Sequence, residues 1–200
     1  EENITNFQYR IFDKRWIFYH PSVVWRIRDN VMKHMLKTNI ALVSCRQVLE
    51  GGFRHAFVTD TIADDSCISN KTRERSYIFP LFLYSDTNQQ SLLEKSTSKS
   101  SNIRWDNLEG LETIQPFTSL LTNNFIQPTE AIFYYVYAIL YSNVYREKYR
   151  EFLKIDFPRI PFTKDYFLFQ ALAQRGEQLV NLHLLKDEDL QRPIVKFQGS

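Results

Sequence analysis

The chain has 200 residues, of which 44% are hydrophobic and 24% charged, a composition ordinary for a soluble globular protein of one domain or two small lobes. Its net charge of +2 by itself says nothing about nucleic acid binding. No apolar run reaches the ~18 residues of a membrane span, and no signal-peptide pattern is present. We therefore expect no membrane contact and a cytoplasmic location, and Cys45 and Cys67 are typical of free thiols in a reducing compartment.

The first part of the chain is predicted to be rich in strands. Two short aromatic segments separated by Asp13, Lys14 and Arg15 indicate a hairpin with these charged residues at its turn. Apolar residues at helical spacing predict a helix over 28–36. Pro80 restricts the last strand of this part to an edge or a bulge. The predicted strands are 7–12, 16–20, 40–44, 55–62 and 77–84.

The second part of the chain is predicted to be helical. It follows a segment over 85–102 that is rich in Ser, Thr, Asn and Gln, which is typical of a linker or mobile loop. Thr129 suits the start of a helix with an apolar stripe, and Asn143 is expected to interrupt it. Thr163 is expected to cap a further helix that ends at Leu185.

A proline-containing segment over 154–162 separates these helical stretches. Pro158 and Pro161 fix φ and remove two backbone donors, so the segment is predicted to be an extended connector. We expect it to lie in a groove and to strap the helical part together. Arg159 is expected to anchor it through an ion pair with Asp156 or a helix acid, and a phosphate contact is the alternative.

Together these elements predict an α+β fold, with a strand-rich, basic N-terminal lobe followed by a helical C-terminal lobe. The expected boundaries are 1–85 for the strand-rich lobe, 86–125 for a linker and variable segment, and 126–200 for a helical support lobe. The sequence contains no internal repeat.

Motifs of the common enzyme classes are absent from the sequence. It has no GxGxxG, GxxxxGK[ST], HExxH or CxxC. It also lacks the Pro-Pro pair of an adenine methyltransferase loop and the acid-x-Lys spacing of a metal-dependent nuclease. The histidines are scattered, and Asp64-Asp65 is interpreted as a solvated loop rather than a cation site. We therefore expect no catalytic residue, metal site or cofactor in this chain. Because the chain begins without Met, we interpret it as a piece of a longer protein.

Basic residues in the first part are interleaved with aromatic and amide side chains. From Arg10 to Arg46, Lys and Arg outnumber Asp and Glu by eight to two. Lys and Arg neutralise phosphates, whereas Arg, Gln and Asn also contact base edges, and duplex recognition needs both. A solvated charged rim is the alternative interpretation. The candidate DNA-binding residues are Arg10, Lys14, Arg15, Arg26, Arg28, Arg46, Gln47, Asn70, Lys71 and Arg73.

The first long helix of the second part carries many tyrosines. Rings spread around a helix are more typical of core and interface packing than of base stacking, which usually uses two or three rings on a sheet or loop. A protein-interaction module that uses these helices is therefore the competing function, and a nuclease is a further alternative. The aromatic residues are Phe133, Tyr134, Tyr135, Tyr137, Tyr141, Tyr145 and Tyr149.

Several segments, taken in order, resemble a known family, the C-terminal specificity domain of type ISP restriction-modification enzymes. The opening Tyr-Arg-Ile-Phe-Asp-Lys-Arg is also similar to target recognition domains of related adenine methyltransferases. Residues 87–123 depart from the family pattern. The matching segments are 9–19, 28–34, 44–48, 55–60, 69–72, 77–84, 132–142, 145–161 and 179–185.

The resemblance implies sequence-specific recognition of double-stranded DNA in a bacterial restriction-modification enzyme. Members of the family join a nuclease, a helicase-like translocase, an adenine-N6 methyltransferase and a target recognition domain in one chain. S-adenosylmethionine, ATP and Mg are therefore expected in the parent chain, and its methyltransferase domain is an expected partner. The resemblance strengthens the DNA interpretation of the basic residues without saying which of them read bases. We expect the loops around 44–50 and 63–75 to do so.

Overall fold

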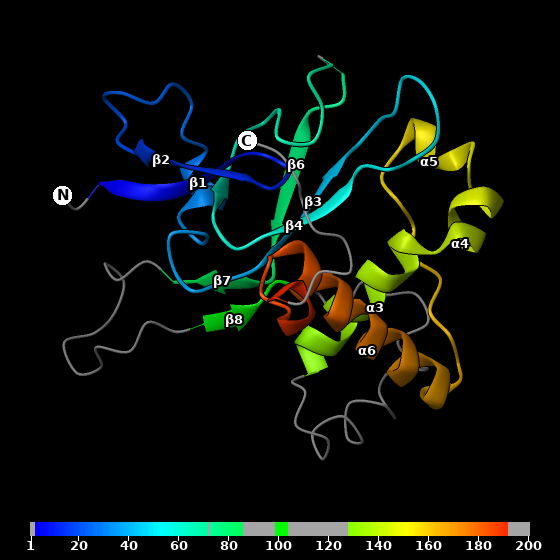
Figure 1. The fold of residues 1–200 in the computed structure, drawn as a ribbon. Coiled ribbons are helices and arrows are strands. Elements are labelled where there is room, and N and C mark those ends of the chain that lie inside the picture. Colours follow the sequence, from blue (N-terminus) through cyan, green and yellow to red (C-terminus); the bar gives the residue numbers. More distant parts are fainter. Residues whose placement is uncertain (1–2, 72, 86–98, 104–127, 192–200) are drawn as a thin grey trace.

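The structure contains strands mostly in its first part and helices mostly in its second, which confirms the predicted α+β class (Figure 1). It is a computed structural model that describes residues 3–71, 73–85, 99–103 and 128–191. The expected linker over 86–125 lies mostly outside the described residues, so the proposed lobe boundaries stay a prediction.

A three-stranded antiparallel sheet in the order β4-β3-β6 forms the centre of the molecule (Figure 1). It consists of β4 (Ala56–Thr59), β3 (Ala41–Cys45) and β6 (Ser76–Pro80). Val43 of the middle strand lies opposite Phe57 and Ile78 of its two neighbours. β6 is an edge strand, as its proline requires, since a proline cannot donate to a further strand.

Two smaller sheets flank the central one. In the first, β1 (Ile4–Arg10) pairs antiparallel with β2 (Asp13–Phe18) and parallel with the short β5 (Ile62–Ala63). In the second, β7 (Phe82–Tyr84) pairs antiparallel with β8 (Lys99–Ser101). The β1–β2 hairpin was predicted, but its turn is formed by residues 11–12 rather than by the charged residues that follow.

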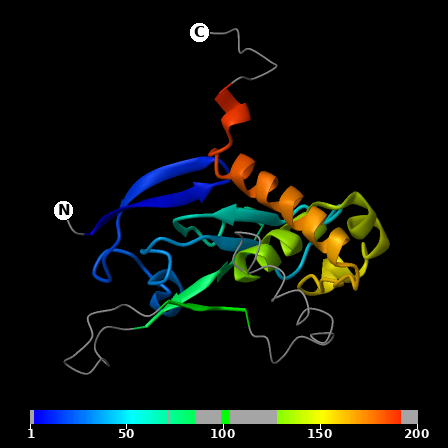
Figure 2. The same cartoon turned by 90° about the horizontal axis from the view of Figure 1, so that it is seen from below.

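The helices gather on one side of the central sheet, where α3 and α6 lie side by side and contact β4 (Figure 2). Ser142 separates α3 from α4 and accepts a hydrogen bond from the Tyr145 N–H at 3.3 Å, so the predicted interruption is confirmed. The helices are α1 (Asp29–Met32), α3 (Pro128–Tyr141), α4 (Asn143–Lys148), α5 (Phe152–Ile155) and α6 (Tyr166–His183), followed by a 3-10 turn over Glu188–Gln191.

The sheet and the helices share their hydrophobic core. One cluster joins Val58 of β4 to Tyr137 of α3 and Val180 of α6. A second joins Cys45 and Phe53 to residues of α3, α4 and α5. Because these clusters bury apolar surface from both parts of the chain, each part stabilises the other.

A close approach between α3 and α6 depends on Gly176. A Cβ atom placed on this residue would lie 1.8 Å from the backbone oxygen of Tyr134 on α3. The missing side chain therefore lets the two helix backbones come into contact.

Asp165 rather than Thr163 caps α6, since its carboxylate accepts the N–H groups of Phe167 and Leu168.

The proline-containing segment over 154–162 is extended and strapped to the helices through its carbonyl oxygens. The hydroxyl of Tyr135 donates to the carbonyl of Pro161 at 2.7 Å, and the hydroxyl of Tyr145 donates to that of Arg159 at 2.9 Å. On the other side, the ring of Phe157 packs edge-on against aromatic rings of β6. The segment thus joins the helices to the sheet, as predicted.

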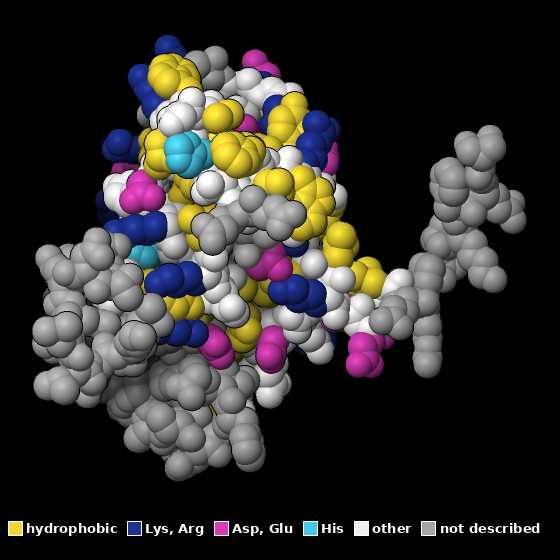
Figure 3. All heavy atoms as spheres, turned by 90° about the vertical axis from the view of Figure 1, so that its left-hand side faces the viewer, with side chains coloured by type: hydrophobic (Ala, Val, Ile, Leu, Met, Phe, Trp, Pro, Cys, Tyr) yellow, Lys and Arg dark blue, Asp and Glu magenta, His cyan; other side chains and the backbone are white. Residues whose placement is uncertain are grey.

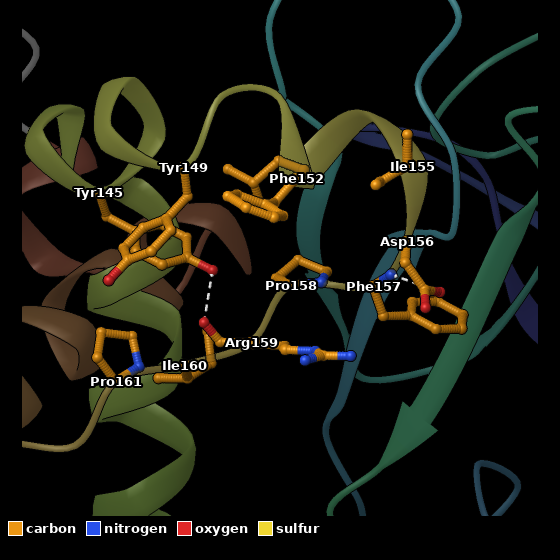
Figure 4. Close-up of a pocket in the computed structure, with 11 residues that line it drawn as sticks. Tyr145, Tyr149, Phe152, Ile155, Asp156, Phe157, Pro158, Arg159, Ile160 and Pro161 are labelled. Carbon is orange, nitrogen blue, oxygen red and sulfur yellow. Dashed lines mark hydrogen bonds between the residues drawn. The ribbon is translucent and has the colours of Figure 1, made fainter.

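The expected ion pair of Arg159 is not formed with any described residue. Asp156 instead accepts a hydrogen bond from the Arg46 side chain at 3.0 Å, which ties the segment to the loop after β3. A cavity of about 580 Å³ lies between the segment and α4–α5, and Figure 4 shows the residues around it. Phe152 and Ile155 on its rim are 69% and 64% exposed.

Candidate DNA interface

Three loops rise on the side of the molecule away from α3 and α6: residues 19–28, 46–55 and 64–75 (Figure 1). The structure therefore brings together candidate DNA-binding residues that are far apart in the sequence. The remaining candidate DNA-binding residues lie on the β1–β2 hairpin. The loops carry Arg26, Arg28, Arg46, Gln47, Asn70, Lys71 and Arg73, and the hairpin carries Arg10, Lys14 and Arg15.

Two arginines of the hairpin stack on the ring of Tyr9. The guanidinium carbon of Arg10 lies 4.1 Å from the ring centroid and that of Arg15 lies 3.9 Å from it. Arg15 also pairs with Asp13 at 2.8 Å, and the hydrogen bond from Arg15 lowers the pKa of Asp13. The two side chains thus form a pre-ordered cationic cluster on the hairpin.

Lys14 of the hairpin is engaged in a bridge to the far end of the chain. Its Nζ lies 2.6 Å from Asp60, whose carboxylate also accepts the Nζ of Lys186 at 2.8 Å. Burial would raise the pKa of Asp60, but the hydrogen bonds from the two lysines outweigh it and lower that pKa. This bridge links β2 to the residues after α6, so a structural role competes with DNA contact at Lys14.

The backbone of the loop over 19–28 is strained at two positions. Arg26 has φ 57° and Arg28 has φ 50°, both in the left-handed region that costs a non-glycine residue roughly 1–2 kcal/mol. Ile27 lies between these two arginines, and the hydroxyl of Tyr19 donates a hydrogen bond to its carbonyl oxygen. This contact ties the end of the loop to its beginning. Strain of this kind persists where surrounding contacts impose it, and it often marks a functional site.

This loop presents a large aromatic ring to solvent. Trp25 is 81% exposed, and the guanidinium carbon of Arg26 stacks over it at 4.4 Å from the ring centroid. No carboxylate of the described residues pairs with Arg26. On the face that carries this loop and the hairpin, basic, acidic and hydrophobic side chains lie interspersed (Figure 3).

The neighbouring acids Asp64 and Asp65 form ion pairs with arginines of β1, of the loop over 19–28 and of the loop over 64–75. Asp64 lies 3.5 Å from Arg10 of β1. Asp65 lies 3.5 Å from Arg28 and 3.3 Å from Arg75, and these three side chains are all partly exposed. The pair Asp64-Asp65 is therefore not a freely solvated loop but the anchor of an arginine cluster. Among the described residues, no group of His, Cys, Asp and Glu side chains could hold a metal ion.

A buried carboxylate, Glu74, fixes two of the loops to each other. It accepts the backbone N–H of Leu49 at 2.8 Å, the hydroxyl of Ser69 at 2.6 Å and approaches Nε2 of His55 at 3.3 Å. Burial would raise the pKa of Glu74, but these hydrogen bonds and the charges of His55 and Lys71 hold it below its ordinary value. Burial lowers the pKa of His55, and Glu74 opposes that shift.

The remaining candidates lie on the surface of these fixed loops. Lys71 pairs with Glu50 at 3.0 Å, and Arg46 pairs with Asp156 at the same distance. Pairs as exposed as these contribute only ~0–1 kcal/mol each, so a phosphate can compete for either cation. Gln47, Asn70 and Arg73 are exposed.

Sequence reasoning missed the groups that organise this surface. Glu74 and Arg75 stand among basic residues that looked like one solvated charge run, and nothing in the local pattern distinguishes the buried acid from its exposed neighbours. Trp25 stands beside Arg26 in the basic first part of the chain, but no pattern in the sequence indicates that its ring is exposed. In the part of the chain that the structure describes, no helix is long and apolar enough to cross a membrane.

A family model described as the Type ISP C-terminal specificity domain matches residues 1–200. The chain belongs to this family. The resemblance drawn from the sequence segments is thereby confirmed. A search of curated proteins finds no significant match.

Two solved structures share the fold of this specificity domain. A cryoEM structure of a DrdV–DNA complex is 23% identical, with a TM-score of 0.65, and the match covers 91% of this chain and 16% of that one. A nuclease-deletion mutant of the Type ISP restriction-modification enzyme LlaGI, in complex with a DNA substrate mimic, is 20% identical, with a TM-score of 0.61. That match covers 91% of this chain and 14% of the LlaGI chain, so this chain spans a small share of both relatives.

Proposed function

We propose that the chain is the sequence-specific, double-stranded DNA target recognition domain of a bacterial restriction-modification enzyme. The observation that carries the proposal is the set of three loops on one side of the central sheet, which buried and half-buried ion pairs join into a single surface. Family membership and the DNA in both solved relatives support it. The loops over 46–55 and 64–75 read base edges, and the arginines and lysines around them contact phosphates.

Catalysis in this proposal is carried out by other domains of a longer protein. The parent chain is an adenine-N6 DNA methyltransferase and restriction endonuclease that uses S-adenosylmethionine, ATP and Mg, and the present domain positions it on its target. The small share of each relative that this chain covers supports such an arrangement. The domain itself contributes binding and orientation rather than a reacting group.

The helical part provides the contact with the methyltransferase domain. Supporting this, α4 and α5 expose large apolar side chains: Val144 is 77% exposed, Phe152 69% and Ile155 64%. Neighbouring exposed apolar residues of this kind are typical of surfaces that another domain covers. Helix α5 lies beside the 46–55 loop, where the backbone N–H of Val48 donates to the carbonyl of Lys154 (Figure 1). A domain docked on α5 would therefore also lie close to this loop.

The tyrosine-rich helix gives little support to the competing interaction module. Tyr135, Tyr137 and Tyr145 are 2%, 0% and 5% exposed, and their hydroxyl groups form hydrogen bonds inside the molecule. A partner could reach these rings only after the core had opened. Packing is therefore the better interpretation of the run, as the sequence suggested.

A DNA-binding titration over a series of salt concentrations tests the proposal. The chain should bind short duplex DNA with an affinity that falls linearly as log affinity against log salt, because phosphate contacts release counterions. A systematic panel of duplex sequences should then reveal a preferred site. Salt-independent binding, or no binding to any duplex, contradicts the proposal, and metal-dependent cleavage by the chain alone would favour a nuclease.

A further inference from the structure

The exposed Trp25 stands at the edge of a cavity. This cavity of about 420 Å³ lies between the loop over 19–28, strand β1 and the Asp64-Asp65 corner. Its volume falls within the roughly 300–1,000 Å³ of small-molecule sites. Phe7, Tyr19 and Trp25 line it with aromatic rings, while Arg28, Asp65 and Arg75 supply charged groups to the same space.

These lining groups suit one class of ligand. A planar heteroaromatic ring would stack on Trp25, and stacking on aromatic side chains accepts any base because every base has a π-face. Guanidinium and carboxylate groups bind the acceptor and donor edges of bases. The stacked Arg26 places a positive charge beside the ring, a group suited to the phosphate of a nucleotide bound there.

The loop that carries Trp25 is built to keep the ring in place. Its backbone is strained at Arg26 and Arg28, and Tyr19 donates to the carbonyl between them. Arg28 is further tied to Asp65. A ring that is 81% exposed gains little from burial in this chain, so the contacts that fix its loop keep it available for a ligand.

We propose that Trp25 and the cavity beside it form a stacking site for a nucleobase displaced from the duplex. This inference rests on the proposed function and adds to it: the domain holds one base outside the helical stack while neighbouring loops read paired bases. Displacing a base costs less where the base is already unpaired, so the site favours DNA with a bulge or mismatch.

The test compares two short duplexes that differ by one bulged 2-aminopurine. Wild-type chain should bind the bulged duplex about tenfold more tightly than the fully paired one. The 2-aminopurine fluorescence and the tryptophan fluorescence should both be quenched on binding, as stacked rings require. Trp25→Ala should bring the affinity ratio close to one and remove both signals, whereas Trp25→Phe should retain part of the ratio.

Trp16→Ala is the matched control, because Trp16 is also exposed, at 71%, but lies on β2 and does not line the cavity. Its affinity ratio should equal that of the wild type, and thermal melts should show all variants folded. Equal binding of both duplexes by the wild type, or quenching that survives Trp25→Ala, would overturn the inference while salt-dependent duplex binding left the proposed function intact. Failure to bind either duplex would overturn both.

Discussion

The carboxylate of Glu74 accepts the backbone N–H of Leu49 at 2.8 Å, a contact between residues on two different loops. Leu49 lies in the loop after β3, and Glu74 lies just before β6. Since the Glu74 side chain is only 3% exposed, its carboxylate is shielded from water, and losing its donors would leave a buried charge without partners. The relative position of the two loops is therefore set inside the domain, before any DNA is bound.

Replacing Glu74 by Gln should destabilise the domain. The variant keeps the shape of the side chain but loses the charge that three donors share, and we expect a loss of about 1–3 kcal/mol in the free energy of unfolding. The measurement is chemical denaturation at neutral pH. Glu50→Gln is the control, because the Glu50 side chain is 83% exposed, and it should change the stability little.

The stability difference between the wild type and Glu74→Gln should depend on pH. The pKa of Glu74 is lowered in the folded chain, so its ionised form stabilises the fold above the unfolded pKa of about 4.3. That stabilisation is lost as the pH falls through the lowered folded value. The difference in melting temperature between wild type and Glu74→Gln should therefore shrink as the pH is taken from 7 to below 4. A difference that stays constant would show that Glu74 acts through packing alone.

Removing a cation from the loop over 64–75 should weaken duplex binding without unfolding the domain. For Lys71→Ala or Arg73→Ala we expect lower affinity for every duplex and a slope of log affinity against log salt that is smaller by about one. Arg175→Ala on α6 is the control, since Arg175 is an exposed arginine outside the proposed surface. A similar loss of affinity for Arg175→Ala would point to non-specific attraction rather than to this surface.

Gly176→Ala should be strongly destabilising. Helix propensity alone favours alanine by about 1 kcal/mol, but the added methyl group would lie 1.8 Å from the Tyr134 backbone oxygen and would force α3 and α6 apart. We expect a net loss of several kcal/mol, measured by thermal melting. Gln174→Ala, at an exposed position of the same helix, should be neutral or slightly stabilising. A Gly176→Ala variant as stable as the wild type would mean that the helices pack less closely than described.

Tyr145→Phe should destabilise the domain more than Arg159→Ala does. The first change removes the hydroxyl that binds the Arg159 carbonyl, at a cost of about 1 kcal/mol. The second removes a side chain that forms no ion pair with the described residues, so its effect should stay within roughly 0.5 kcal/mol. Denaturation curves of the two variants decide the question, and the reverse order would restore the anchoring role first expected for Arg159.

Elements with strong local signals were predictable from the sequence. The pattern of apolar residues located most of the strands, and Pro80 placed β6 at an edge. The single strands predicted over 55–62 and 77–84 each divide into two strands of different sheets, and β8 lies in the predicted linker. Asn143 correctly marked the interruption after α3. Predictions failed where a tertiary contact determines where an element begins or ends. The helix expected over 28–36 is only the short α1, because Arg28 is left-handed and the carbonyl of His34 bonds to the side chain of Asn39.

The hairpin turn and the interface show the same limit. Phe12 adopts φ 62° and packs its ring against Phe57 and His183. These contacts fix the turn at residues 11–12, immediately before the charged residues. Composition indicated a basic, amide-rich first part of the chain as the candidate interface. It could not show that Asp65 joins Arg28 to Arg75, since that relation exists only after residues far apart in the sequence have folded together.

The tyrosines that strap the proline-containing segment donate their hydrogen bonds to its carbonyl oxygens, and the ring of Tyr135 also stacks on that of Phe162. Every amino acid, proline included, carries that oxygen. These two hydrogen bonds therefore do not depend on which residues stand at positions 159 and 161, provided that the extended backbone is kept, whereas Phe157 and Phe162 are held through their rings. Exposed side chains such as that of Arg159 can therefore change to suit a new neighbouring domain while the backbone attachment of the segment stays unchanged.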